Sequence, residues 1–243
     1  MNQNQEKEDT KTMKGLFTIG KFDQYRTVEE LIKRSKSDGF YYTLLVLSSL
    51  IVAAGLLLSN APIVMGGMIV TPLITPILLV SLGISIGDFK LIKRVSLFLG
   101  KSIIVIAGVS FLVGVLFGKT GNDPTDLFSL ADNLNGAALY FLVALVSGFV
   151  AAFTWTRKGL SRIMPGIAIA VALIPPLSLI GVGFSFFDVE MIRSNFLLFF
   201  FNLIGITLGA TLVFSLFRFH EVEEKVEREV ENQKEEEVIE ESE

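Results

Sequence analysis

The fold is decided by a stretch of 26 residues in the first half of the chain, 63-IVMGGMIVTPLITPILLVSLGISIGD-88. It is apolar enough to cross a bilayer, yet two prolines and two threonines stand at its centre, in 71-TPLITP-76. A proline inside a helix removes a backbone donor and clashes with the carbonyl four residues earlier. The stretch therefore predicts a membrane helix that is broken in its middle.

The composition of the chain is that of a membrane protein. Of its 243 residues, 51% are hydrophobic and 21 are Phe, which is more apolar than an ordinary soluble domain. The 25 acidic and 21 basic residues nearly balance, so nothing indicates a nucleic-acid partner. There is no cysteine, which excludes disulfides, thiolate metal sites and thiol catalysis. The first 38 residues lack the apolar core of a signal peptide, so the first membrane helix is expected to remain in the mature protein.

Six apolar runs reach the length of about 20 residues that a spanning helix needs. We place them at 39–58, 62–87, 97–118, 137–156, 164–186 and 195–217. Bases favour the cytoplasmic flanks of such helices. With the N-terminus inside, only Lys119 and Arg193 are outside, while ten bases are cytoplasmic: Lys33, Arg34, Lys36, Lys90, Lys93, Arg94, Arg157, Lys158, Arg162 and Arg218. We therefore expect a multi-pass protein of the cytoplasmic membrane with both termini in the cytoplasm.

The sequence also contains an internal repeat with an offset of 100 residues. Ten of the 26 positions of the opening stretch are identical in 163-IMPGIAIAVALIPPLSLIGVGFSFFD-188, where roughly one in ten would match by chance in so apolar a composition. The pairs are Ile63/Ile163, Gly66/Gly166, Ile69/Ile169, Leu73/Leu173, Ile74/Ile174, Pro76/Pro176, Leu79/Leu179, Gly83/Gly183, Ser85/Ser185 and Asp88/Asp188. Because three spans are an odd number, a second repeat of three enters the membrane from the other side.

These observations predict the fold class. We expect an all-α integral membrane protein with six transmembrane helices in two inverted three-helix repeats, 39–118 and 137–218. Its second and fifth helices should be broken by proline, because 171-VALIPP-176 occupies the place of the first break. The six-helix domain, 39–218, follows a basic cytoplasmic segment, 1–38, and precedes an acidic tail, 219–243. Within the first segment, residues 22–39 predict an amphipathic helix on the inner leaflet, with Phe22, Leu31 and Ile32 on its apolar side.

The paired breaks are the predicted substrate site. A carbonyl freed in hydrocarbon is costly, so a broken helix belongs inside a bundle or beside a cavity. Half-helices that begin near Pro76 and Pro176 would point their positive ends at the midplane, which favours an anion or a polar neutral solute. The site residues are Thr71, Thr75, Pro76, Pro175, Pro176 and Ser178. The alternative is a pair of ordinary proline kinks that bind nothing.

The two signature stretches resemble a known family. GGMIVTPLITPILLVSLGISIGD, with the following 89–94, and GIAIAVALIPPLSLIGVG are similar to two blocks of an uncharacterised hydrophobic domain family, domain of unknown function number 389. The resemblance covers residues 40–218. It implies a prokaryotic multi-pass membrane protein whose biochemical activity is not established. Many members carry a small soluble domain, for which the ends of this sequence are too short.

Four further features have weaker interpretations. Lys101 and Asn202 are candidates for a polar pathway through the spans. The alternative for Lys101 is that its ammonium extends to the cytoplasmic surface. The alternative for Asn202 is a hydrogen bond between two helices. Asp88 and Asp188 are expected to cap the helices that follow them. The spacings Gly114/Gly118 and Gly205/Gly209 bring helices close and give a weak indication of a homo-oligomer.

Two classes of function remain open. The first is a transporter or channel for a small solute or ion that uses the paired breaks; the second is a non-transporting membrane scaffold or regulator whose charged tails recruit partners. We expect no enzyme, because the spans contain no nucleophile and base pair, metal cluster or carboxylate pair. No cofactor is expected, and the expected partners are the lipid bilayer and a small solute.

Overall fold

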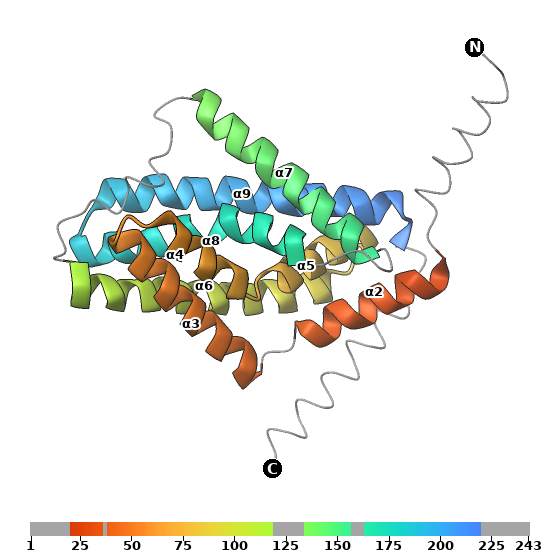
Figure 1. Ribbon diagram of the computed structural model, residues 1–243. Helices are drawn as coiled ribbons and strands as arrows, with labels where there is room; N and C mark the ends of the chain where they lie inside the picture. Colours follow the sequence, from red (N-terminus) through yellow and green to blue (C-terminus); the bar gives the residue numbers. More distant parts are fainter. Residues whose placement is uncertain (1–19, 36–37, 119–133, 157–162, 220–243) are drawn as a thin grey trace.

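The computed structural model describes residues 20–35, 38–118, 134–156 and 163–219. Within these ranges the chain forms eight helices and no strand (Figure 1). The helices are α2 (Lys21–Arg34), α3 (Gly39–Leu57), α4 (Ala61–Val70), α5 (Ile74–Ile86), α6 (Phe89–Phe117), α7 (Leu134–Thr156), α8 (Ile163–Phe186) and α9 (Val189–Leu216). Most of the predicted acidic tail, 220–243, and the bases Lys36, Lys119, Arg157, Lys158 and Arg162 lie outside the described residues.

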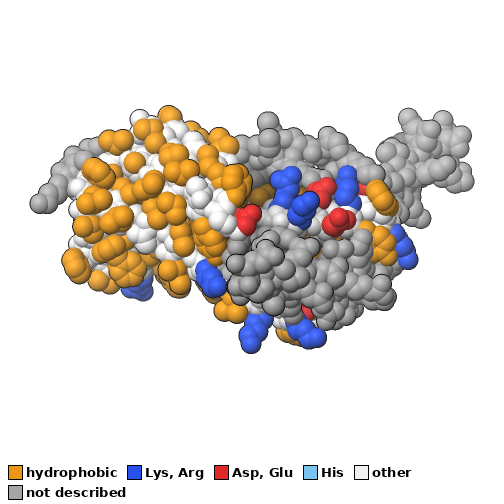
Figure 2. All heavy atoms as spheres, turned by 90° about the horizontal axis from the view of Figure 1, so that it is seen from below, with side chains coloured by type: hydrophobic (Ala, Val, Ile, Leu, Met, Phe, Trp, Pro, Cys, Tyr) orange, Lys and Arg blue, Asp and Glu red, His pale blue; other side chains and the backbone are white. Residues whose placement is uncertain are grey.

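The described residues are all-helical, and the lengths and composition of the helices are those of a membrane protein. Helices α3, α6, α9 and the 138–156 part of α7 are each long and apolar enough to cross a bilayer. The pair α4 and α5 is bent by 58° and gives a fifth crossing if it is one span. Helix α8 corresponds to the run expected at 164–186 and has 24 residues. Figure 2 shows hydrophobic side chains over one half of a face of the molecule and charged ones in the other half.

Two corners of the chain have the same local geometry at positions 100 residues apart. Asp88 caps α6 by accepting from the backbone N of Leu91 at 3.0 Å, and Asp188 caps α9 by accepting from that of Met191 at 2.9 Å. The backbone N of each aspartate donates at 3.0 Å to the carbonyl of the glycine five residues earlier. The residue before each aspartate is left-handed, with φ 80° at Gly87 and 56° at Phe187. The predicted capping by Asp88 and Asp188 is therefore confirmed.

Glycines allow several helix pairs to approach closely. Gly205 and Gly209 of α9 pack on the backbone of α7, and Gly114 and Gly118 of α6 pack on Ser185 and Phe186 of α8. These are the glycines whose spacing indicated a homo-oligomer. Each of the two pairs is used between helices of one chain, so the spacing gives no support to a second copy.

Helix α8 lies at the centre of the helix bundle. All of its residues from 173 to 183 are buried, and Figure 1 shows it between α6 and α9. Gly181 packs on Ala107 and Ser110 of α6, and Gly183 on Ile192 of α9. A helix that is apolar on every side is expected in such an interior position.

Helix α2 packs on the protein rather than lying free on a membrane surface. Leu31 and Ile32, which were expected to face the inner leaflet, are buried in the same core cluster as residues of α5 and α7, while Phe22 is exposed. Gln24 donates from Nε2 to the carbonyl of Phe217 at 2.7 Å. The Oγ1 of Thr27 lies 2.8 Å from the carbonyl of Asp23 in its own helix and 3.2 Å from that of Trp155. The carbonyls of Phe217 and Trp155 are at C-terminal helix ends, where the backbone acceptors have no partner within the helix. Helix α2 therefore caps α9 and α7.

Close glycine packing predicts a sharp contrast between two identical substitutions. A Cβ at Gly209 would meet the backbone of Leu145 and Phe149, whereas one at Gly108 meets nothing within 4 Å. We expect Gly209→Ala to destabilise the protein by about 1–3 kcal/mol through overpacking. Gly108→Ala should leave stability unchanged or raise it slightly. Thermal unfolding of the detergent-purified variants measures both, and equal midpoints would contradict the close α7–α9 packing.

The capping by α2 predicts a loss of stability when its two donors are removed. In Gln24→Ala with Thr27→Val, the bonds to the carbonyls of Phe217 and Trp155 are lost, and each such bond contributes about 0.5–1.5 kcal/mol. The thermal unfolding midpoint should fall. Glu29→Ala, at an exposed position of the same helix, is the control and should change little; a double variant as stable as this control would show that α2 does not hold the helix ends.

Candidate functional site

The candidate site is the break between α4 and α5. Helix α4 ends at Val70 and α5 begins at Ile74. A continuous helix would need backbone donors at Pro72 and Pro76, which have none. In the bent chain Pro76 falls in the first turn of α5, where a backbone N–H would have no partner within the helix. The predicted half-helix beginning near Pro76 is therefore present.

The break lies at mid-depth of the neighbouring helix α3. Helices α3 and α4 form an antiparallel pair in which a Cβ on Gly67 would be 3.0 Å from the backbone N of Val52. Thr71 is one turn beyond Gly67 and is therefore about level with Ser48, one turn before Val52. Ser48 is the tenth of the 19 residues of α3. The backbone of the break is thus about level with the middle of α3, and the Thr75 side chain beyond it reaches the C-terminal end of α2.

The predicted second break is wrong, because α8 runs without interruption from Ile163 to Phe186 with Pro175 and Pro176 inside it. The difference has a physical reason in the spacing of the prolines. Pro72 and Pro76 are four residues apart and disturb two successive turns, whereas adjacent prolines deprive only the carbonyls at 171 and 172 of their donors. Neighbouring helices can hold such a kinked but continuous segment, and α8 is buried among them from 173 to 183.

Ser178 of α8 is at the depth of the α4–α5 break. Val182 shares a buried cluster with Ala53 and Leu57 of α3, and the two helices run in the same direction along α6, so Ser178 is about level with Ser49. The Ser178 side chain is fully buried, and its Oγ has no hydrogen-bond partner among the described residues. Leaving a buried hydroxyl unpaired costs about 1–3 kcal/mol. Such a hydroxyl is free to contact a ligand.

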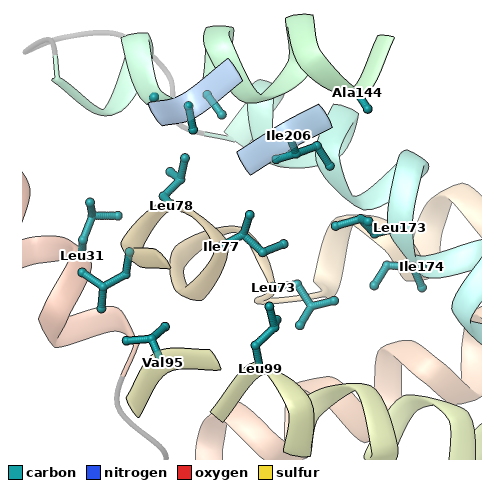
Figure 3. Close-up of a cluster of buried hydrophobic side chains, with 14 of the residues drawn as sticks. Leu31, Leu73, Ile77, Leu78, Val95, Leu99, Ala144, Leu173, Ile174 and Ile206 are labelled. Atoms are coloured by element: carbon teal, nitrogen blue, oxygen red, sulfur yellow. The ribbon is translucent and has the colours of Figure 1, made fainter. Parts of the chain in front are cut away.

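An apolar cluster separates the break from the proline turn of α8 in this conformation. Figure 3 shows the side chains of Leu73, Ile77, Leu99, Leu173 and Ile174 gathered between the ribbons of α5, α6 and α8. All five belong to the main buried core. The structure therefore brings the two proline segments to the same region of the bundle, with leucine and isoleucine between them.

The two threonines of the predicted site bond to the protein. Thr71 is half-buried and donates from Oγ1 to the carbonyl of Gly67 at 3.3 Å. Thr75 is buried, and its Oγ1 lies 3.3 Å from the carbonyl of Arg34 in α2 and 3.4 Å from that of Pro72. Thr75 thus connects the break to the C-terminal end of α2, a contact that no sequence pattern predicts.

The predicted polar pathway residues have different environments. Lys101 is exposed on α6, whereas Asn202 is buried in α9. Two buried polar side chains were missed: the Oγ of Ser110 and the Oδ1 of Asn195 have no hydrogen-bond partner among the described residues. The only sequence signal for either is a polar residue at a helical spacing that faces the bundle. Within the described residues, no group of three His, Cys, Asp or Glu side chains is placed to hold a metal ion.

Comparisons with known proteins agree with the resemblance carried by the two signature stretches. The uncharacterized protein MJ0678 of Methanocaldococcus jannaschii is 27% identical over 194 residues, which are 79% of this chain and 58% of that protein. The chain therefore spans less than two thirds of that relative's length. No solved structure matches the chain. Residues 68–208, more than half of the chain, match the family described as domain of unknown function (DUF389), and the chain belongs to this family.

Proposed function

We propose that this protein is a transporter or channel for a small solute or ion, with its site where the α4–α5 break faces the Ser178 turn of α8. The observation that supports the proposal best is the fully buried Ser178 hydroxyl, which has no partner among the described residues and is level with an interrupted backbone. Irregular backbone at membrane depth is tolerated where it is enclosed by protein or lines a water-filled cavity. Discontinuous helices of this kind form the substrate sites of many secondary transporters.

We further propose that the chain consists of two inverted repeats. The matching corners at Asp88 and Asp188 support this proposal, because α5 and α8 end in the same way and α6 and α9 begin in the same way. Within each half, the first and third helices also pack in parallel. Ser102 of α6 accepts or donates a bond to the Tyr41 hydroxyl of α3 at 3.0 Å, and Gly205 and Gly209 of α9 follow successive turns of α7.

The proposed orientation places the charged end of the bundle in the cytoplasm. Of the ten bases assigned to that side, Lys33, Arg34, Lys90, Lys93, Arg94 and Arg218 are within the described residues. These six bases lie at the end of α2, at the start of α6 and just after α9. Lysine and arginine beside a membrane-spanning helix favour the cytoplasmic side. Both termini and the capping helix α2 then belong to the cytoplasmic side of the cytoplasmic membrane.

The chemistry of the break favours an anion or a polar neutral solute. Helix α5 begins at the break without a side-chain cap, and the N-terminal end of a helix attracts negative charge. The Ser178 hydroxyl can both donate and accept. The described parts of the spans contain no carboxylate between Phe40 and Gly87 or between Val171 and Phe187, so a cation would have only carbonyl and hydroxyl oxygens as ligands.

A non-transporting scaffold is the second candidate, and the apolar cluster around Leu73 and Leu173 favours it. If that cluster never opens, water does not reach the break and the polar groups there serve only to hold the helices. The two candidates therefore differ in whether water enters at Ser178.

Water access can be measured because the chain has no cysteine. We expect Ser178→Cys to react with a membrane-impermeant thiol reagent. Ser49→Cys is the matched control, since Ser49 is also fully buried and at about the same depth, but its hydroxyl is bonded to the carbonyl of Leu45. It should stay unlabelled, while Lys90→Cys at the charged end reacts. If Ser178→Cys is as inert as Ser49→Cys, the scaffold becomes the better explanation.

Straightening the break should reduce transport. Each proline-to-alanine change in a helix interior gains roughly 3 kcal/mol of helix propensity, so Pro72→Ala with Pro76→Ala favours a continuous helix by far more than tenfold. Proteoliposomes are tested for flux of chloride, phosphate, glycerol and urea. For the solutes that wild type carries, the double variant should lose most of the flux. Pro62→Ala, in the first turn of α4, should keep it; equal flux in all three proteins would remove the break from the mechanism.

A further inference from the structure

A stripe of basic residues runs along the exposed side of α6. At 3.6 residues per turn, Lys90, Arg94, Leu97 and Lys101 lie within about 60° of one another around the helix axis. Lys90 and Lys101 are exposed and Arg94 is half-buried. From the first to the last of these residues the helix rises roughly 16 Å. The stripe therefore extends from the charged corner at Asp88 to the level of Tyr41, at the start of α3, because the neighbouring Ser102 bonds to the Tyr41 hydroxyl.

Lys101 lies among side chains that face lipid. Leu97, one turn before it, is 62% exposed, and Ile104, almost one turn after it, is 71% exposed. On a helix long and apolar enough to span a bilayer, such exposed apolar side chains are available to acyl chains. The ammonium groups of Lys90 and Lys101 form no ion pair with a carboxylate of the described residues. An unpaired cation at this position needs either water or an anion that the membrane itself supplies.

The corresponding stripe of α9 has a different chemistry. The matched Asp88 and Asp188 corners place Glu190, Ser194, Leu197 and Phe201 at the positions equivalent to the basic stripe. All four are exposed, yet the stripe contains no base. A helix that follows such an aspartate-capped corner therefore does not need a basic stripe in order to fold. The basic stripe is a property of α6 and not of α9.

We propose that the basic stripe of Lys90, Arg94 and Lys101 binds the phosphate headgroup of an anionic phospholipid. Lysine and arginine near a membrane surface attract anionic lipid by about 1 kcal/mol for each residue, and the long lysine stem lets the ammonium of Lys101 reach from the acyl region towards the headgroup. The exposed Leu97 and Ile104 on either side of Lys101 would contact the acyl chains of the same lipid. A soluble anion would gain nothing from these apolar neighbours.

The proposal is tested on the purified full chain in detergent by native mass spectrometry. Phosphatidylglycerol is titrated, and the bound fraction is compared with that of phosphatidylcholine, which has a neutral headgroup. We expect Lys101→Gln to weaken phosphatidylglycerol binding about fivefold, the factor that corresponds to about 1 kcal/mol. Lys101→Arg keeps the charge and should bind like wild type. Arg193→Gln removes a base from the α9 corner and should also bind like wild type.

Each alternative outcome overturns the proposal. If Lys101→Gln binds phosphatidylglycerol like wild type, Lys101 only extends its ammonium to water. If Arg193→Gln weakens binding as much as Lys101→Gln, the lipid responds to total charge rather than to the stripe. If inorganic phosphate displaces the lipid at equal concentration, the stripe recognises a free anion and the apolar neighbours play no part. Size-exclusion profiles of the variants show whether each is folded.

Discussion

In hydrocarbon every backbone N–H and C=O group needs a hydrogen-bond partner within the protein. At the break between α4 and α5 the regular helical hydrogen bonds are interrupted, so other groups must bond to the backbone there. The backbone N of Thr71 donates to the carbonyl of Met68 at 3.3 Å. The Thr71 hydroxyl bonds to the carbonyl of Gly67, and the Thr75 hydroxyl lies between the carbonyls of Pro72 and Arg34. The two threonines thus replace part of the bonding that the prolines remove. Their first role is to hold the bend.

The bend in turn requires close neighbours, and glycine provides them. Helix α4 can pack on α3 because Gly55 and Gly67 have no side chain at the crossing, where a Cβ would meet the backbone N of Val64 or Val52. Dispersion contacts between closely approaching backbones are a main source of helix association in lipid, where no hydrophobic effect drives it. The bend, the α3–α4 pair and the buried position of α8 are therefore parts of one packing arrangement.

The sequence predicts most of the helices and one of the two breaks. The apolar parts of the helices, the caps at Asp88 and Asp188, and the bend before Pro76 follow from local rules of hydropathy, capping and proline geometry. Helices α6 and α9 begin eight and six residues before the runs expected at 97–118 and 195–217, because their first turns are polar and follow directly from the aspartate caps. The continuity of α8 does not, because whether Pro175 and Pro176 break a helix depends on how its neighbours support it. The bond between Thr75 and Arg34 joins residues 41 positions apart, and no local rule identifies that partner.

The sequence pattern alone does not show which surface the closely spaced glycines contact. A spacing of four between Gly205 and Gly209 is compatible with a contact to a second copy or to a neighbouring helix of the same chain. The structure shows that both glycines pack on α7 of the same chain. The same holds for polar residues: Thr75 and Ser178 belong to equivalent apolar stretches, yet one hydroxyl bonds to α2 and the other has no partner among the described residues.

The two halves of the proposed site therefore have different properties. On one side, the backbone of the α4–α5 bend is interrupted, and the hydroxyls of Thr71 and Thr75 already bond to backbone carbonyls. On the other, α8 is continuous and buried, and it presents an uncommitted hydroxyl at Ser178. A change of shape at such a site costs least if the bent pair moves and α8 stays in place, because moving α8 would disturb its packing with both α6 and α9. The bond from Thr75 to the end of α2 would then couple that movement to the cap over α7 and α9.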